Sequence, residues 1–572
     1  MLVSAGALLL WRLLILVLAA ALTPAATVDI ILDDAYYYLQ VAYNIAHLGR
    51  STYDGIEDTN GYQPAWMLLI AGLELLLRLE KKGLYVALQV LMLLCMALPL
   101  GFCLRRLRDP FYLGLSAGLV CSYSWFPGTY LCGLETVLFA PAFVVVAHVA
   151  RRGLHDNAGR LAWILAAATW IRLDAVSLVV AFSLPLAQRA LRERGPAAAM
   201  SAMARFIAPA VLVLAVYAVP NWVVFGSPVP LSGVAKTIGA PPFSNWGILY
   251  NYLLQTLPVM PFAGVVLALE WRHGRFRDGS FAYGGIALLG LSLGVHYFYY
   301  AAFSGWIPWP WYFYAYALMV ALLVTRLIEL HAGWSAPSQA RPRAVSLAFL
   351  VLAGLAFPGL THALVGNQAW KNHTGVTQNG GSFNRRNALD AERFARDPAP
   401  HVVAIGDRAA GLGFWSPPRV NVFAMEGLVS SRAYLDARRH DEGERYIREQ
   451  IRPELLVVDR ETLPLVRLAN EERYVVIEPI QPRVVLDHLL VYCFRKDAVV
   501  REIHERDDQL IVLPAPATRI TFDFAKAEPC TGAFADYAQA QILSPESLRR
   551  HGVGVEYVGY MGGDFNAALE RF

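Results

Sequence analysis

The chain has 572 residues, of which 56% are hydrophobic and only 16% are charged. A soluble protein of this length would carry about 25% charged residues, so these values exclude a wholly soluble protein, and the mean hydropathy is accordingly high at +0.40. The formal net charge of +4 is small, and its Arg residues fall in short loops, which indicates membrane topology rather than affinity for nucleic acid.

The sequence predicts a polytopic α-helical membrane protein with about 11 transmembrane helices. A membrane-crossing helix needs about 20 residues. The first apolar segment is too long for the core of a signal peptide and lacks a basic start, so we expect a retained helix, in which Arg12 has a packing role. The predicted spans are 5–26, 84–104, 111–127, 135–150, 161–172, 174–188, 205–225, 246–270, 280–303, 311–330 and 344–364.

The segment at 65–79 is apolar but short, and its placement decides the orientation of everything after it. If it does not cross the membrane, the Arg clusters at 105–108, 151–160, 189–194, 272–277 and 341–343 share the side of the N-terminus. Positive loops remain inside. We therefore expect an amphipathic or re-entrant helix at the outer surface, which puts the first outer loop, 27–83, and the other unusual loops on the extracytoplasmic face.

Residues 366–572 form a second predicted domain, after a membrane domain of residues 1–365. Its strand-like segments are 401–407, 418–423, 454–459, 473–480, 488–494 and 519–524, with a helical stretch at 431–451. This pattern predicts an extracytoplasmic α/β domain. Cys493 and Cys530 lie in it, and an oxidising compartment would allow either a disulfide between them or two free thiols.

Two adjacent carboxylates, Asp33 and Asp34, follow the first apolar segment and precede Tyr36, Tyr37 and Tyr38. One Asp could cap a helix that ends at Gly49. A cap does not explain both, because neighbouring carboxylates raise each other's proton affinity. A general base or a cation site is the functional alternative. The tyrosines could stack on a sugar or belong to an aromatic belt at the interface.

The other outer loops also carry polar and aromatic candidates. Asn60, Tyr62, Gln63 and Trp66 cluster in the turn TNGYQPAW, where the turn and the following helix explain only Gly61 and Pro64. Glu135 begins a span, where the helix dipole alone would stabilise it. Arg172 and Asp174 form a tight turn, in which they could pair with each other or Arg172 could hold an anion.

Lys236 is the one lysine of the central membrane region and could bind a phosphate or lie in solvent. Trp309, Trp311 and Tyr312 lie in WIPWPWYFY, which could be a belt or a lid over a lipid-linked ligand. If a divalent cation (Mg, Mn or Ca) binds, Asp33 and Asp34 are its candidate ligands.

Together these motifs resemble the GT-C superfamily of membrane glycosyltransferases, which use polyprenyl-phosphate sugars, and most of all its bacterial branch of arabinofuranosyltransferases. The resemblance rests on DDAYYYLQVAYNIAHLG, TNGYQPAW, CGLETVLF, TWIRLDAV, FGSPVPLSGVAKT and WPWYFYAYAL, which span roughly residues 28–330. Gln63 stands where many relatives would carry His, and the C-terminal part matches no carbohydrate-binding module.

The resemblance implies an inverting transfer of a sugar, arabinofuranose or another pentose or hexose, to a hydroxyl of a glycan, lipid or protein. It would take place outside the inner membrane of a bacterium. Asp33 would be the base and Asp34 would orient the acceptor or bind a cation. Lys236 and Arg172 would neutralise the leaving phosphate, and Glu135, Asn60 and Gln63 would bind sugar hydroxyls.

Two other classes of function would also explain many spans. A flippase or transporter of lipid-linked sugars would be expected to show inverted repeats with charges at the midplane, whereas the polar residues here gather at one face. A non-catalytic anchor for the soluble part predicts no such gathering of polar and aromatic residues.

Overall fold

The computed structural model describes two parts of the chain, one helical and one α/β. The described residues are 31–125, 127–130, 132–238, 281–306, 309–333, 384, 387–388, 391–392, 395, 401–406, 409–453, 455–458, 474–477, 491–495, 500–506, 509–514, 519–523 and 554–558. The predicted spans 5–26, 246–270 and 344–364 lie outside them, as does Cys530 of the predicted disulfide.

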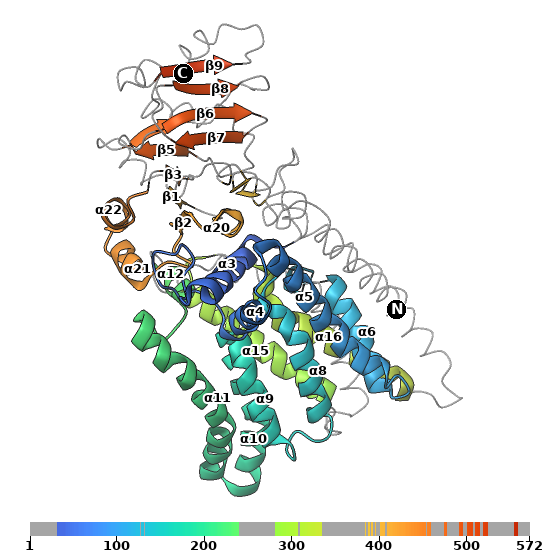
Figure 1. Cartoon of the computed structure of the whole chain (residues 1–572). Helices are drawn as coiled ribbons and strands as arrows, with labels where there is room; N and C mark the ends of the chain where they lie inside the picture. Colours follow the sequence, from blue (N-terminus) through green and yellow to red (C-terminus); the bar gives the residue numbers. More distant parts are fainter. Residues whose placement is uncertain are drawn as a thin grey trace, which may run out of the picture.

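The helical part is a bundle with short helices at one end (Figure 1). Its elements are α3 (Asp33–Leu48), α4 (Pro64–Leu77), α5 (Lys81–Leu104), α6 (Pro110–Trp125), α7 (Pro127–Tyr130), η2 (Glu135–Leu138), α8 (Phe139–Ala150), α9 (Ala158–Ile171), η3 (Leu173–Ala175), α10 (Val176–Arg194), α11 (Pro196–Phe225), α12 (Leu231–Ala235), α15 (Phe281–Phe303), η5 (Pro310–Phe313) and α16 (Tyr314–Gly333).

Within the described residues, four helices are long and apolar enough to cross a membrane. They are Lys81–Leu104, Leu173–Arg194, Pro196–Phe225 and Gly285–Phe303. The helices at the predicted spans 111–127, 135–150 and 161–172 are shorter, and the predicted number of about 11 stays a prediction.

The helix α4 lies at the 65–79 segment and is apolar on both faces, so its amphipathic or re-entrant placement stays a prediction. Pro64 starts it, and its inner face buries Trp66 and Glu74, the latter 2.8 Å from Nε2 of His47 in α3. The opposite face exposes a row of leucines, as a helix lying in a membrane surface would. They are Leu68, Leu69, Leu75, Leu76 and Leu77.

Two glycines bring the backbones of α6 and α16 into contact. A Cβ on Gly114 would lie 2.8 Å from Cα of Thr325, and one on Gly118 would lie 2.2 Å from the backbone oxygen of Ala321. Small residues at such crossings allow the close packing that stabilises helices in membranes. The η5 turn before α16 is thereby fixed against the bundle.

The α/β part contains two sheets. The first has the order β2-β1-β3-β5-β4, in which β1 is parallel to β2 and β3 while β5 is antiparallel to β3 and β4; the second has the order β7-β6-β8-β9. The strands are β1 (His401–Ile405), β2 (Val420–Ala424), β3 (Leu455–Val458), β4 (Tyr474–Ile477), β5 (Val491–Arg495), β6 (Val500–Arg506), β7 (Gln509–Pro514), β8 (Arg519–Asp523) and β9 (Gly554–Val558).

Each of the six segments expected as strands overlaps one, but sequence reasoning missed β6, β7 and β9. The expected helix at 431–451 is divided into α21 (Arg432–Arg439), α22 (Gly443–Tyr446) and a π-helical turn (Ile447–Ile451). Asp441, between the first two, has φ +59°, a left-handed conformation that ends a helix.

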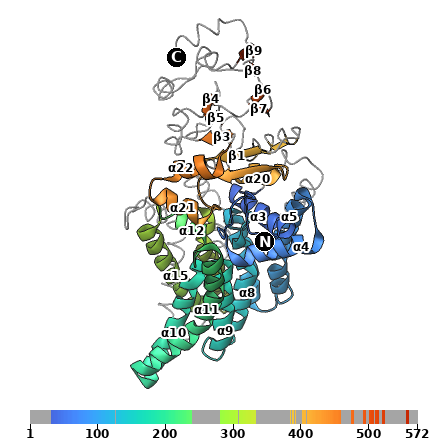
Figure 2. The same cartoon turned by 60° about the vertical axis from the view of Figure 1, so that its left-hand side comes forward.

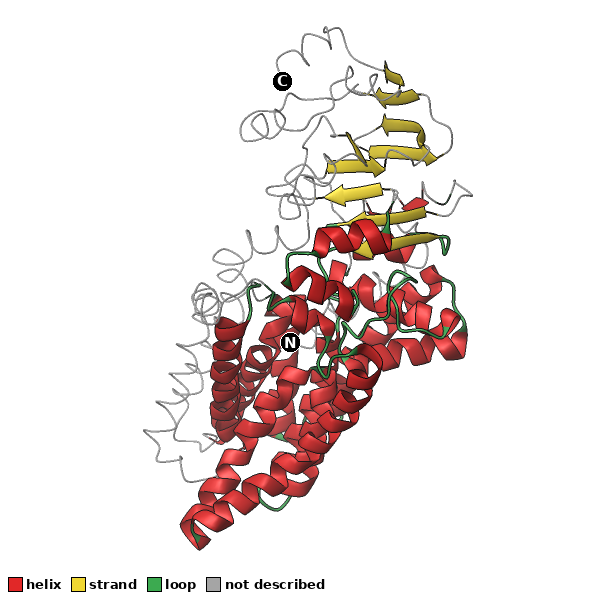
Figure 3. Ribbon diagram, turned by 90° about the vertical axis from the view of Figure 1, so that its left-hand side faces the viewer, coloured by secondary structure: helices red, strands yellow, loops and turns green. Residues whose placement is uncertain are grey.

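The α/β part meets the helical part at the end that carries α3, α4 and α12 (Figures 2 and 3). Its helix α20 (Ala410–Trp415) packs on α3, and α21 packs on α12. Tyr53, in the loop after α3, is buried and donates a hydrogen bond to the backbone oxygen of Ala409 (2.8 Å).

Candidate active site

A polar pocket lies where the two parts meet. Its empty volume is about 520 Å³. The helical part supplies most of the wall, and the segment after β2 supplies the rest. The lining residues are Asp34, Tyr37, Tyr38, Val41, Gly61, Tyr62, Gln63, Leu134, Glu135, Arg172, Ser232, Lys236, Trp311, Tyr312, Leu428 and Val429.

The paired carboxylates begin α3 but face different surroundings. The N-cap of α3 is Leu32, so neither Asp33 nor Asp34 caps the helix, as one of them would if it had only a structural role. Both lie in the first turn, where the helix dipole stabilises negative charge. Asp34 lines the pocket, whereas Asp33 accepts a hydrogen bond from the backbone N–H of Gly411 in α20 (3.4 Å). The two carboxylates therefore have different neighbours, the pocket for Asp34 and the α/β part for Asp33.

Tyr37 and Tyr38 follow one turn later and both line the pocket. The hydroxyl of Tyr38 donates to Oε2 of Glu135 (3.0 Å) and accepts the backbone N–H of Gln63 (2.9 Å). The hydroxyl of Tyr37 donates to Glu426 in the α/β part. These bonds connect α3 with three other chain segments, so they are specific contacts rather than those of an interfacial belt.

Arg172 is at the centre of a buried ionic network. Its Nη1 donates to Oε1 of Glu135 (2.5 Å), and its Nε and Nη2 donate to Asp174, at 3.1 and 2.8 Å. Tyr300 and Tyr314 also donate to Asp174, at 3.2 and 3.1 Å. Only 3% of Arg172 is exposed. Two carboxylates fix its guanidinium, and the residue lines the pocket.

Lys236, just after α12, supplies a second cation. Its Nζ donates to the hydroxyl of Tyr312 (2.6 Å) and lies 5.3 Å from the centre of that ring and 5.8 Å from that of Trp306. Burial lowers the pKa of Lys236, but Tyr312 and Asp34 raise it more, so the net pKa lies above its ordinary value. A charged ammonium therefore faces the pocket near Asp34.

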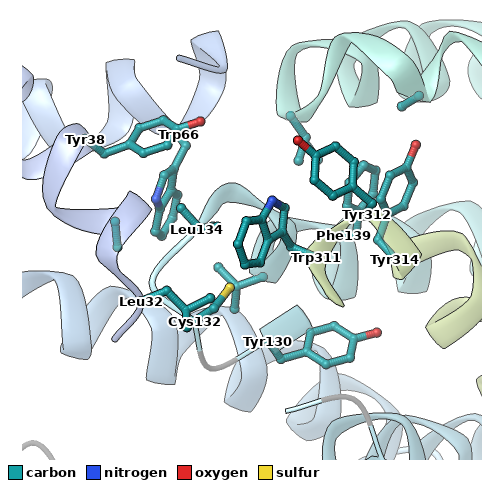
Figure 4. Packing of buried hydrophobic residues seen from close by; sticks show 14 of the residues in the cluster. Leu32, Tyr38, Trp66, Tyr130, Cys132, Leu134, Phe139, Trp311, Tyr312 and Tyr314 are labelled. Atoms are coloured by element: carbon teal, nitrogen blue, oxygen red, sulfur yellow. The ribbon is translucent and has the colours of Figure 1, made fainter. Parts of the chain in front are cut away.

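Aromatic rings complete this side of the pocket. Trp311 stacks on Tyr312 with ring centres 6.0 Å apart, and Trp309 stacks on Trp311 at 5.9 Å. Figure 4 shows Tyr38 of α3, Leu134 before η2, and Trp311 and Tyr312 of η5 in this region. Trp311 and Tyr312 line the pocket, and Trp309 packs behind them.

Five candidate residues from the sequence do not line the pocket. Besides Asp33 and Trp309, Asp174 holds Arg172 from behind, Asn60 accepts the backbone N–H of Leu231 (3.0 Å), and Trp66 donates to the backbone oxygen of Gly133 (3.0 Å). The polar atoms of Asp174, Asn60 and Trp66 thus bond to other parts of the protein, and these bonds hold in place the loops that carry the lining residues.

Sequence reasoning missed several lining residues. Gly61, Leu134 and Ser232 adjoin candidates that it did name, so proximity to those motifs could have found them. Leu428 and Val429 lie far from the motifs, after a strand, where apolar residues are ordinary core. No signal in the sequence connects them with the first outer loop.

A divalent cation at Asp33 and Asp34 stays a prediction. The described residues hold no group of three or more His, Cys, Asp or Glu side chains placed to bind a metal ion. Divalent cations such as Mg²⁺ and Ca²⁺ prefer several oxygen ligands. Here Asp33 and Asp34 diverge, and Glu135 is bonded to Arg172 and Tyr38.

Comparison with known proteins yields no family. No family model matches the chain, and no curated protein matches its sequence. Among solved structures, the chain is similar to ArnT from Cupriavidus metallidurans bound to undecaprenyl phosphate, with 13% identity over 84% of this chain and 98% of that one and a TM-score of 0.44. The apo state of the same protein is 14% identical over 84% of this chain and 97% of that one, with a TM-score of 0.43. At this identity and these TM-scores, the likeness assigns neither a family nor a function.

Proposed function

We propose that the chain is an inverting membrane glycosyltransferase of the GT-C type, which moves a sugar from a polyprenyl-phosphate donor to an acceptor hydroxyl outside the cytoplasmic membrane. One observation carries the proposal. A carboxylate, Asp34, shares a pocket with two cations, the half-buried Lys236 and the buried Arg172, at one end of a bundle of apolar helices. This combination suits an anionic, lipid-borne substrate.

The residues support a single displacement. Asp34 would accept the proton of the acceptor hydroxyl as its oxygen bonds to the anomeric carbon. The bond from that carbon to the phosphate oxygen breaks, and polyprenyl phosphate leaves with the bonding electrons. Attack opposite to the leaving group inverts the configuration, through a transition state with oxocarbenium character. The sequence favoured Asp33 as the base, but only Asp34 of the pair lines the pocket, so we assign the role to Asp34.

The leaving phosphate gains charge as the bond breaks, so fixed cations lower the barrier. Arg172 already bonds two carboxylates, Glu135 and Asp174, whereas Lys236 donates a hydrogen bond to the hydroxyl of Tyr312. We therefore assign the phosphate mainly to Lys236. Arg172 provides a rigid positive background and orients Glu135.

The sugar would lie between the aromatic side and the polar side of the pocket. Rings such as Trp311 and Tyr312 present faces on which the C–H groups of a sugar can stack, while Gln63 and Glu135 offer partners for its hydroxyls. The sequence motifs resemble those of arabinofuranosyltransferases, so arabinofuranose is the first donor sugar to test, followed by other pentoses and hexoses.

A transfer assay tests the proposal. Membranes containing the protein receive polyprenyl-phosphate donors radiolabelled in the sugar, and the label is followed in products. We expect label in a glycan, lipid or protein, with inverted anomeric configuration. Label that crosses the bilayer while still on the lipid would instead identify a flippase. Label that neither moves nor transfers, across all donors, would identify a non-catalytic anchor.

A further inference from the structure

We propose that the segment Met425–Ser431, which follows β2, forms the acceptor-binding wall of the pocket, with Leu428 and Val429 as its contact residues. The inference rests on the proposed function and deepens it. It gives the α/β part a place in the active site, which neither the motifs nor the comparisons assign.

The segment is in backbone contact with the first outer loop. A Cβ on Gly61 would lie 1.9 Å from the backbone oxygen of Leu428 and 3.1 Å from Cα of Val429. The hydroxyl of Thr59 donates to the backbone oxygen of Ser430 (3.2 Å). The backbones of the two segments are too close for a layer of water between them. They therefore form one continuous wall.

The segment is also held firmly from its own side. The hydroxyl of Ser430 donates to the backbone oxygen of Ala424 (2.9 Å), and that of Tyr434 donates to the backbone oxygen of Met425 (2.8 Å). Gly427 has φ +90°, which favours glycine, and Leu435 packs where its Cβ would be. A wall fixed in this way can discriminate between ligands by shape.

Glu426 connects the segment with α3, the helix that carries Asp34. It accepts the hydrogen bond of Tyr37, which lies one turn after Asp34 and also lines the pocket. Glu426 is 9% exposed and Tyr37 is 4% exposed. The α/β part thus sets the orientation of a ring next to the proposed base.

The chemistry of the pocket assigns the wall to the acceptor rather than to the donor. The donor's phosphate belongs with Lys236 and Arg172, and its polyprenyl chain must stay with the apolar helices. Leu428 and Val429 carry no charge and come from the part that lies beyond the end of the bundle (Figure 1). A ligand that approaches from that part meets these two side chains and Asp34. We infer an acceptor that presents an apolar face, such as the C–H face of a sugar ring, beside its reacting hydroxyl.

Kinetics with each substrate varied separately test the assignment. The probes are a polyprenyl-phosphate sugar as donor and a panel of short oligosaccharides with an octyl aglycone as acceptors. Removing a side chain of this size from an apolar contact costs about tenfold or more in specificity. We therefore expect Leu428→Ala and Val429→Ala to raise KM for the acceptor about tenfold, with KM for the donor unchanged. An unchanged acceptor KM, or an equal rise for the donor, would overturn the assignment.

Two controls separate binding from folding. Leu428→Met keeps most of the side-chain volume and should restore the acceptor KM, and Arg439→Ala changes an exposed residue of α21 and should leave both KM values as in the wild type. Thermal melting of each variant in detergent identifies loss of folding.

Direct binding of the same oligosaccharides distinguishes this inference from the proposed function. If Leu428→Ala weakens binding about tenfold but the wild type transfers no sugar, the acceptor-binding wall stands and the proposed glycosyltransferase activity is rejected. Transfer with unchanged acceptor binding would keep the enzyme and reject the wall. If the wild type neither binds nor glycosylates any member of the panel, both fail.

Discussion

At the scale of single residues, the pocket separates two carboxylates that the sequence presents as a pair. Asp34 faces Lys236 across the cavity, and Asp33 bonds the backbone of α20. A base must reach the proton it removes, so position decides between two chemically identical groups. Adjacent helix residues point about 100° apart, and sequence alone does not tell which direction leads to the substrate.

We expect Asp34→Asn to lower kcat by about 10²–10⁴-fold, the usual contribution of a general base. Asp33→Asn is the matched variant, with the same chemical change one residue away. It should retain most of kcat and lose mainly thermal stability, because Asp33 does not line the pocket and accepts a hydrogen bond from Gly411. Single-turnover transfer with a lipid-linked donor measures both. A severe loss in Asp33→Asn with normal turnover in Asp34→Asn would reverse the assignment.

Arg172 shows one of the two roles that the sequence left open for it. The sequence left a partnership with Asp174 and an anion site as alternatives, and the structure shows the ion pair in a residue that also lines the pocket. A charged side chain among apolar segments stands out in a sequence because its burial is costly. Its second carboxylate partner, Glu135, comes from another loop, and that pairing requires the fold.

Replacing Arg172 by Met should destabilise the protein by about 3–5 kcal/mol, because Glu135 and Asp174 would remain buried without their cation. The control is Arg189→Met, which removes an exposed i,i+4 pair with Glu193 and should leave the melting temperature unchanged. Thermal unfolding in detergent compares the two. Equal melting temperatures of wild type and Arg172→Met would show that the network does not stabilise the fold.

At the scale of elements, the predicted helices and strands agree with the structure where period and length give a signal. The short helix α4 was predicted from an apolar run too short to span a membrane, and β1 from an apolar run before Gly406. The strand β6 was not, because VREIHER carries four charged residues that hide its alternation. The contact between Gly61 and Leu428 was also beyond prediction, since it joins positions far apart in the chain.

Gly61→Ala should separate the two loops, because its Cβ would lie 1.9 Å from the backbone oxygen of Leu428. We expect a lower melting temperature and a loss of acceptor binding. In the matched change Gly72→Ala, the new Cβ meets nothing within 4 Å, and Ala should stabilise the helix α4 by about 0.5–1 kcal/mol. A Gly61→Ala protein as stable and active as the wild type would show that the loops are not in contact.

The first outer loop also carries a buried carboxylate. Burial raises the pKa of Asp54 from 3.8 to about 7, although the backbone N–H groups of Glu57 and Ile56 lower it. The folded state therefore binds this proton more tightly than the unfolded chain, and its contribution to stability is fully present below pH 3.8 and lost as the pH rises through about 7.

Asp54→Asn removes this titration, so the stability of the wild type relative to the variant should fall as the pH rises from about 4 to about 8. Melting temperatures of both proteins across that range measure the effect. Asp58→Asn, an exposed position of the same loop, is the control. A difference in melting temperature between wild type and Asp54→Asn that does not change with pH would contradict the raised pKa of Asp54.

At the scale of the whole molecule, the proposed active site requires that its loops share one membrane face. The Arg distribution predicted that the loops holding Asp34, Glu135, Arg172, Lys236 and Trp311 lie on one side, and the structure brings these residues into one pocket. Charge asymmetry made this predictable because it acts on every loop alike. The closure of the pocket by the α/β part was not predictable, since docking between distant parts leaves no periodic pattern.

Labelling with a membrane-impermeant thiol reagent on intact cells tests this claim most directly. The probes are Asp58→Cys, exposed in the first outer loop, and Arg160→Cys, exposed in a predicted inner loop, each in a protein whose six native cysteines are replaced. We expect Asp58→Cys to be labelled from outside and Arg160→Cys only after the membrane is permeabilised. The reverse pattern, or equal labelling of both, would contradict an extracytoplasmic pocket.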